Sequence, residues 1–134
     1  MRGRMVNKLC FGNTHREPNI EEGKCTLVAF SEVSLLQKAR DGLPGMLGTP
    51  KASSLLAELN YYYNVGRCGI GYHGDTERRL VVAIRVGAAM PLYYQWYQDH
   101  VPVGDTFSVT LEEGDMYVMG SKAVAPSRVQ PSLL

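Results

Sequence analysis

The stretch "GIGYHGDTERR", residues 69–79, contains the residue pair with the clearest chemical potential in this chain. His73 and Asp75 are two positions apart, so on the end of a strand their side chains would point to the same side. An imidazole nitrogen and a carboxylate oxygen are also what the facial triad of non-haem Fe(II) sites takes from a protein, together with a second histidine. The same spacing occurs in ordinary surface turns, so by itself it favours a turn over a metal site.

The other candidate residues have simpler interpretations. His100 could replace a metal ligand, but it falls in a loop between expected strands, and we predict that it is solvated. His15 stands among charged residues and is expected to be exposed. Arg78 and Arg79 could contact a phosphate of a nucleic acid. Glu77 beside them dilutes that charge, so we favour a solvated strand start.

Length and composition indicate a soluble domain without a strong electrostatic preference. The chain has 134 residues, of which 45% are apolar and 20% charged, and its formal net charge is +1. This charge argues against wholesale adhesion to nucleic acid or to a membrane. No stretch approaches the roughly 18 apolar residues of a membrane span, and the basic N-terminus lacks the apolar core of a signal peptide. We therefore expect an intracellular, soluble protein with no membrane association.

The cysteines show no pattern typical of a scaffold or a metal cluster. Cys10, Cys25 and Cys68 are odd in number and include no Cys-x-x-Cys spacing. The expectation is three reduced thiols.

The first half of the chain predicts a mixture of irregular and helical segments. Residues 1–25 are rich in glycine, asparagine and charge, and indicate an extended N-terminal segment. A short strand is predicted over residues 25–30, and a helix over residues 31–42 that stops at Gly42, followed by a loop. A second helix is predicted over residues 49–60, with Thr49 as N-cap, Pro50 at the first helical position and an apolar leucine face.

From residue 61 onward the apolar period changes from 3.6 to 2, which is typical of strands. Strands are predicted over residues 80–87, 91–98, 106–111 and 116–119. In the clearest of them, Phe107, Val109 and Leu111 are expected to face inward. Residues 125–134 have no period and are predicted to be an unstructured tail. The pattern favours a mainly β fold with flanking helices (α+β), arranged as an antiparallel sandwich or barrel.

The region around the His-x-Asp pair resembles the AlkB-like branch of the 2-oxoglutarate- and Fe(II)-dependent dioxygenases. That family carries Asn-x-Tyr-x-x-Gly and, a few residues later, Ile-Gly-x-His-x-Asp. The matching positions in this chain are Tyr63, Gly66, Ile70, Gly71, His73 and Asp75. Tyr61 stands where the family has asparagine, and Asn60 comes one residue early. The resemblance extends over most of residues 9–124.

This resemblance implies a double-stranded β-helix, or jelly roll, over residues 26–124. His73 and Asp75 would be iron ligands, and the Tyr63 hydroxyl would bind 2-oxoglutarate. The implied reaction consumes 2-oxoglutarate and O2, releases succinate and hydroxylates a C–H bond. In AlkB-like enzymes that bond is often in an N-methyl group, which makes an alkylated nucleic acid or protein the expected substrate class.

The resemblance stops after Val124. The family continues with a strand that carries a second iron histidine and another whose arginine pairs with 2-oxoglutarate. Here no histidine follows His100, and Arg128 is the last arginine. We therefore expect a jelly roll that is incomplete at its C-terminus, in a truncated family member with impaired activity. The alternative is a non-catalytic jelly-roll remnant or binding module. A cupin-like metal protein is disfavoured because cupins usually supply more histidines.

Overall fold

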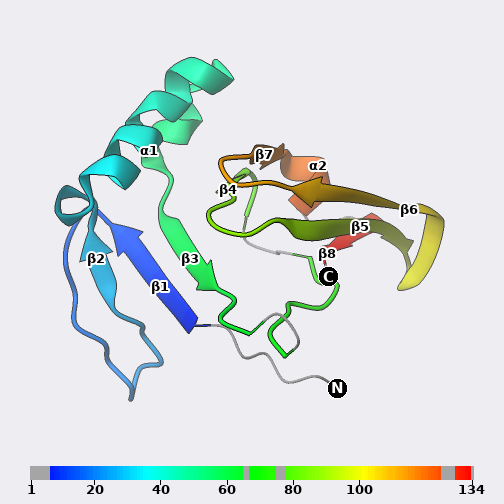
Figure 1. Ribbon diagram of the computed structural model, residues 1–134, viewed down its shortest axis with the longest axis horizontal. Coiled ribbons are helices and arrows are strands. Elements are labelled where there is room, and N and C mark those ends of the chain that lie inside the picture. The colour runs from blue at the N-terminus through cyan, green and yellow to red at the C-terminus, as the bar shows by residue number, and fades with distance from the viewer. Residues whose placement is uncertain (1–6, 65–66, 75–77, 125–128, 134) are drawn as a thin grey trace. The chain divides into compact units, whose positions relative to one another are not determined.

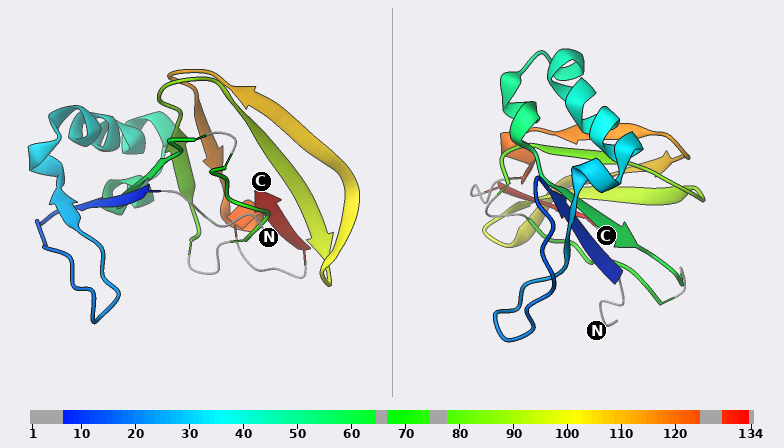
Figure 2. Two further views of the ribbon diagram at one scale, coloured as in Figure 1. Left: turned by 60° about the horizontal axis from the view of Figure 1, so that its bottom comes forward. Right: turned by 90° about the vertical axis from the view of Figure 1, so that its left-hand side faces the viewer.

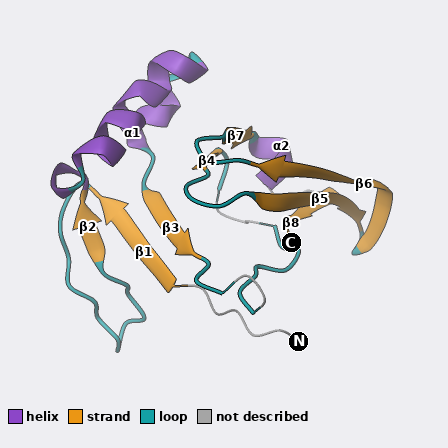
Figure 3. Ribbon diagram, viewed as in Figure 1, coloured by secondary structure: helices purple, strands orange, loops and turns teal. Residues whose placement is uncertain are grey.

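The computed structural model describes residues 7–64, 67–74, 78–124 and 129–133. The chain divides into two compact units, Met1–Cys68 and Gly69–Leu134, and each is described by itself. Strands predominate over helices in the described ranges, which confirms the mainly β prediction (Figure 3). No helix in these ranges is long and apolar enough to span a membrane.

The first unit is a three-stranded sheet with helical segments beside it (Figure 1). Its elements are β1 (Asn7–Gly12), β2 (Leu27–Ala29), the 3-10 helix η1 (Phe30–Glu32), α1 (Ser34–Leu47), the 3-10 helix η2 (Pro50–Ser54) and β3 (Ala57–Tyr61). Strand β1 is central, parallel to β2 and antiparallel to β3. The predicted extended segment 1–25 therefore contains a sheet strand. Buried apolar residues of this unit are Phe11, Ala29, Phe30, Leu43 and Ala52.

The predicted helix over residues 31–42 is confirmed, but it ends later than expected. Helix α1 continues through Gly42 and Pro44 to Leu47, where a loop was predicted. Burial of the Leu43 side chain stabilises this additional turn of the helix. It does so although Pro44 has no backbone N–H to donate to the helical hydrogen-bond pattern. The helix stops at Gly48, whose φ of 62° is the left-handed conformation that glycine adopts at little cost.

The predicted helix over residues 49–60 is wrong. Its start signal is real, because the Thr49 side chain accepts a hydrogen bond from the Lys51 N–H at 3.4 Å and Pro50 takes the first helical position. The helix ends at Ser54, however, and β3 follows. Five residues of β3 pair with β1, and this long-range ladder outweighs the local helical signal.

The second unit contains two separate antiparallel sheets. Its elements are β4 (Val81–Ile84), β5 (Met90–Gln98), β6 (Val101–Leu111), β7 (Met116–Met119), α2 (Ser121–Val124) and β8 (Val129–Leu133). Strands β4 and β7 form one sheet, and β6, β5 and β8 form the other in that order. The β5–β6 hairpin is thus nested in sequence between the two strands of the β4–β7 pair. The long β5–β6 ladder can be followed in both views of Figure 2.

Two features of this unit differ from expectation. Strand β8 lies where an unstructured tail was predicted, because it pairs with the free side of β5. In β6, Leu111 is buried, whereas Phe107 and Val109 are 60% and 37% exposed. The inward prediction is therefore wrong for Phe107 and Val109. Alternation shows which side chains share a face, but burial also needs a second layer over that face.

Candidate functional site

His73 lies in an irregular segment that precedes β4 in the second unit, not on a strand end as expected. Its neighbour Tyr72 packs edge-on against Tyr97 of β5, with 6.1 Å between the ring centroids. This aromatic contact anchors the segment to the central strand of the three-stranded sheet. His73 is half-buried there.

The imidazole of His73 is oriented by the backbone two residues earlier. Its Nδ1 atom lies 2.8 Å from the carbonyl oxygen of Gly71. A carbonyl oxygen only accepts, so Nδ1 must carry the proton, and in the neutral ring the lone pair is then on Nε2. Histidines that bind metals usually donate their other ring N–H to a carbonyl or carboxylate in this way. This contact favours the His73 tautomer whose Nε2 lone pair can bind a metal.

The other two predicted site residues are placed differently. Asp75 falls outside the described residues, so its position relative to His73 rests on the sequence alone. Tyr63 belongs to the first unit, just beyond the end of β3, and is 45% exposed. Its ring lies 6.2 Å from that of Tyr61, in agreement with the alternation that places these two tyrosines on one side. Asn60 belongs to the opposite face of β3 by the same alternation.

The remaining histidines occupy other settings. His100 forms the turn between β5 and β6 together with Asp99, with φ values of 67° and 48°, and it is exposed as predicted. His15 contacts two carboxylates, with Nε2 3.0 Å from Glu17 and Nδ1 3.4 Å from Glu32. The Glu17 hydrogen bond is the main cause of a raised His15 pKa. Within the described part of the chain, no three histidine, cysteine or carboxylate side chains form a metal-binding group.

One pair of reactive residues was missed by the sequence interpretation. The sulfur atoms of Cys10 and Cys25 lie 2.8 Å apart in the first unit. Nothing in their spacing suggests this contact, because it depends on the pairing of β1 with β2.

Comparison with known proteins finds a viral relative of this chain. The chain is 46% identical over 129 residues to an uncharacterized protein of Acanthamoeba polyphaga mimivirus. The aligned region is 92% of this chain and 50% of the viral protein, so the chain spans about half the length of this curated relative. No protein-family model matches the chain, and no solved structure matches it.

Proposed function

We propose that this chain is part of an AlkB-like 2-oxoglutarate- and Fe(II)-dependent dioxygenase. The observation that carries the proposal is the state of His73. Its position in the Ile-Gly-x-His-x-Asp stretch matches the family motif, and its Nδ1–H is bonded to a carbonyl so that Nε2 can coordinate a metal.

The topology of the second unit also supports a jelly roll. A jelly roll is a long antiparallel hairpin that folds over, so that successive nested strand pairs alternate between two sheets. Here the outer pair β4–β7 and the inner pair β5–β6 belong to different sheets. Hydrogen bonds between Arg85 and both Gly114 and Asp115 continue the outer ladder toward the fold-over point, at 2.8–2.9 Å. This is the pairing expected of half a jelly roll.

The proposed iron site rests on the family motif. The resemblance to the family assigns the imidazole of His73 and the carboxylate of Asp75 as ligands of Fe(II), and the Tyr63 hydroxyl as a donor to 2-oxoglutarate. Bound iron would supply the oxidising power for C–H hydroxylation with O2, which amino-acid side chains lack. An alkylated nucleic acid or protein is the proposed substrate class.

Metal binding by the intact chain tests this proposal. Anaerobic calorimetric titration with Fe(II) should show that His73→Ala weakens binding about tenfold or more, since even the loss of outer-shell partners costs that much. His100→Asn is the matched control, because asparagine tolerates the positive φ of this exposed turn residue. Equal Fe(II) affinity in the wild-type protein and a folded His73→Ala variant would refute the assignment.

A non-catalytic binding module is the second candidate. It is favoured by residues 125–134, whose sequence departs from the family pattern. A binding module should form no succinate from 2-oxoglutarate, whether or not it binds Fe(II).

A further inference from the structure

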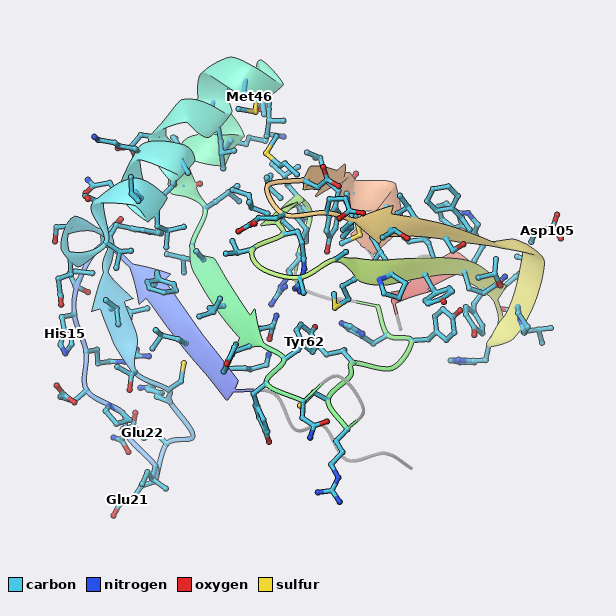
Figure 4. The ribbon with its side chains drawn as sticks, viewed as in Figure 1. His15, Glu21, Glu22, Met46, Tyr62 and Asp105 are labelled. Carbon is cyan, nitrogen blue, oxygen red and sulfur yellow. The ribbon has the colours of Figure 1, made fainter. Side chains whose placement is uncertain are left out.

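The contact between Cys10 and Cys25 is built by the strand pairing of the first unit. Cys10 lies in β1, where it pairs in register with Leu27 of the parallel strand β2. Cys25 precedes β2 by two residues. The chain between the two thiols doubles back and is fastened by backbone bridges between Arg16 and Leu27 and between Asn19 and Lys24. These pairings hold the backbone near both cysteines in place. Figure 4 shows the segment between them, residues 11–24, with His15 and Glu22 labelled.

The two thiols have different surroundings. Cys25 is exposed, and its sulfur lies 2.8 Å from the sulfur of Cys10. Cys10 is half-buried and faces Glu58 across the β1–β3 ladder. Burial, followed by the Cys25 contact and the Glu58 charge, raises the pKa of Cys10 to about 11. Cys10 thus carries little thiolate at neutral pH, and solvent reaches Cys25 more readily.

We propose that Cys10 and Cys25 are a redox-active thiol pair that closes to a disulfide by exchange with a low-molecular-weight disulfide. The Cys25 thiolate attacks the small disulfide, forms a mixed disulfide and expels one small thiolate. Cys10 then loses its proton to solvent and attacks the Cys25 sulfur, which expels the second small thiolate. Two protein thiols are oxidised, and one small disulfide is reduced to two thiols.

A disulfide would link the two ends of the segment formed by residues 11–24. The bond would join the middle of β1 to the approach to β2 and enclose residues 11–24 in a covalent loop. Because neither cysteine has a role in the proposed iron site, this pair can be tested independently of the iron proposal.

The test is to treat the folded 134-residue protein with oxidised glutathione, block the remaining thiols by alkylation and measure the intact mass. The proposal predicts loss of two of the three thiols, a mass change of two hydrogen atoms and a Cys10–Cys25 cross-linked peptide after proteolysis. Cys68→Ser should then have no thiol left to alkylate. Cys10→Ser should instead retain one glutathione on Cys25, because the resolving thiol is gone.

Three results would overturn the proposal. One is stable glutathionylation of Cys25 in the wild-type protein without a link to Cys10. Another is a link from either residue to Cys68 or to a second chain. The third is failure of both thiols to react while circular dichroism shows folded protein.

Discussion

Thr106 of β6 donates a hydrogen bond from its hydroxyl to the side-chain oxygen of Gln95 on β5, at the point where the register of the two strands shifts. The Gln95 side-chain amide also donates to the carbonyl oxygen of Val103 at 3.0 Å. Gln95 is 5% exposed, so these bonds satisfy its buried side-chain amide. They also give the Val103 carbonyl a donor beside the register shift.

Replacement of Gln95 by leucine should destabilise the second unit by about 1–3 kcal/mol, because it removes the hydrogen bonds of the buried amide to the Thr106 hydroxyl and to the Val103 carbonyl, each worth about 0.5–1.5 kcal/mol. Urea denaturation, followed by circular dichroism, measures this loss. Gln98→Leu is the matched control, since Gln98 is exposed on the same strand. An equal loss in both variants would contradict a specific role for the Gln95 amide.

Arg40 of α1 should be equally important in the first unit. Its guanidinium donates to the carbonyl oxygens of Leu55 and Ser53, each at 2.8 Å, and lies 4.5 Å from the Phe30 ring centroid. Arg40→Met removes both charged hydrogen bonds and should lower the free energy of unfolding by about 1.5–3 kcal/mol. Thermal unfolding would show this as a lower Tm. Lys38→Met, at an exposed position of the same helix, should change Tm little; a comparable drop there would refute the assignment.

His15 should titrate above the ordinary histidine pKa of 6.5, chiefly because of its hydrogen bond to Glu17. A raised folded-state pKa means that the contact stabilises below the unfolded pKa and that this contribution is lost as pH rises through the folded pKa. NMR titration of the His15 ring protons measures the midpoint. Glu17→Gln should lower it toward the ordinary value, and Glu32→Gln should lower it less. An unchanged midpoint in Glu17→Gln would contradict the proposed cause.

The oxidised Cys10–Cys25 form should be more stable than the reduced form. Closure of a loop of about 15 residues is worth roughly 3 kcal/mol in the chain-entropy account. Urea midpoints of the first unit should therefore rise after treatment with oxidised glutathione in the wild-type protein and in Cys68→Ser. Cys25→Ser should show no rise, and an equal rise in that variant would rule out the disulfide as the cause.

The strands of the second half of the chain could be predicted from the sequence, because apolar and polar residues alternate along them. Residues 116–119 and 91–98 match β7 and most of β5. The helix over residues 49–60 could not be excluded from sequence, since Thr49 and Pro50 are sound start signals. The pairing that replaces it joins β3 to β1, about fifty residues away, and local periodicity carries no information on such a partner.

The candidate site was predictable as a motif but not as geometry. The family motif around His73 and Asp75 suggested iron, although their spacing alone favoured a turn. The bond from Nδ1 of His73 to the Gly71 oxygen depends on the irregular path of the backbone. The contact of Cys10 with Cys25 likewise depends on a parallel strand pair and on the segment between its strands. Chemistry-bearing residue types can be read from the sequence, but their tautomers and spatial neighbours come from the fold.

Release of succinate from 2-oxoglutarate in the presence of Fe(II) and ascorbate tests the central claim most directly, because uncoupled turnover needs no knowledge of the substrate. The proposal predicts slow, Fe(II)-dependent succinate formation by the 134-residue chain that is lost in His73→Ala and kept in His100→Asn. Absence of succinate from folded wild-type protein, or an unchanged rate in His73→Ala, would contradict a dioxygenase centred on His73.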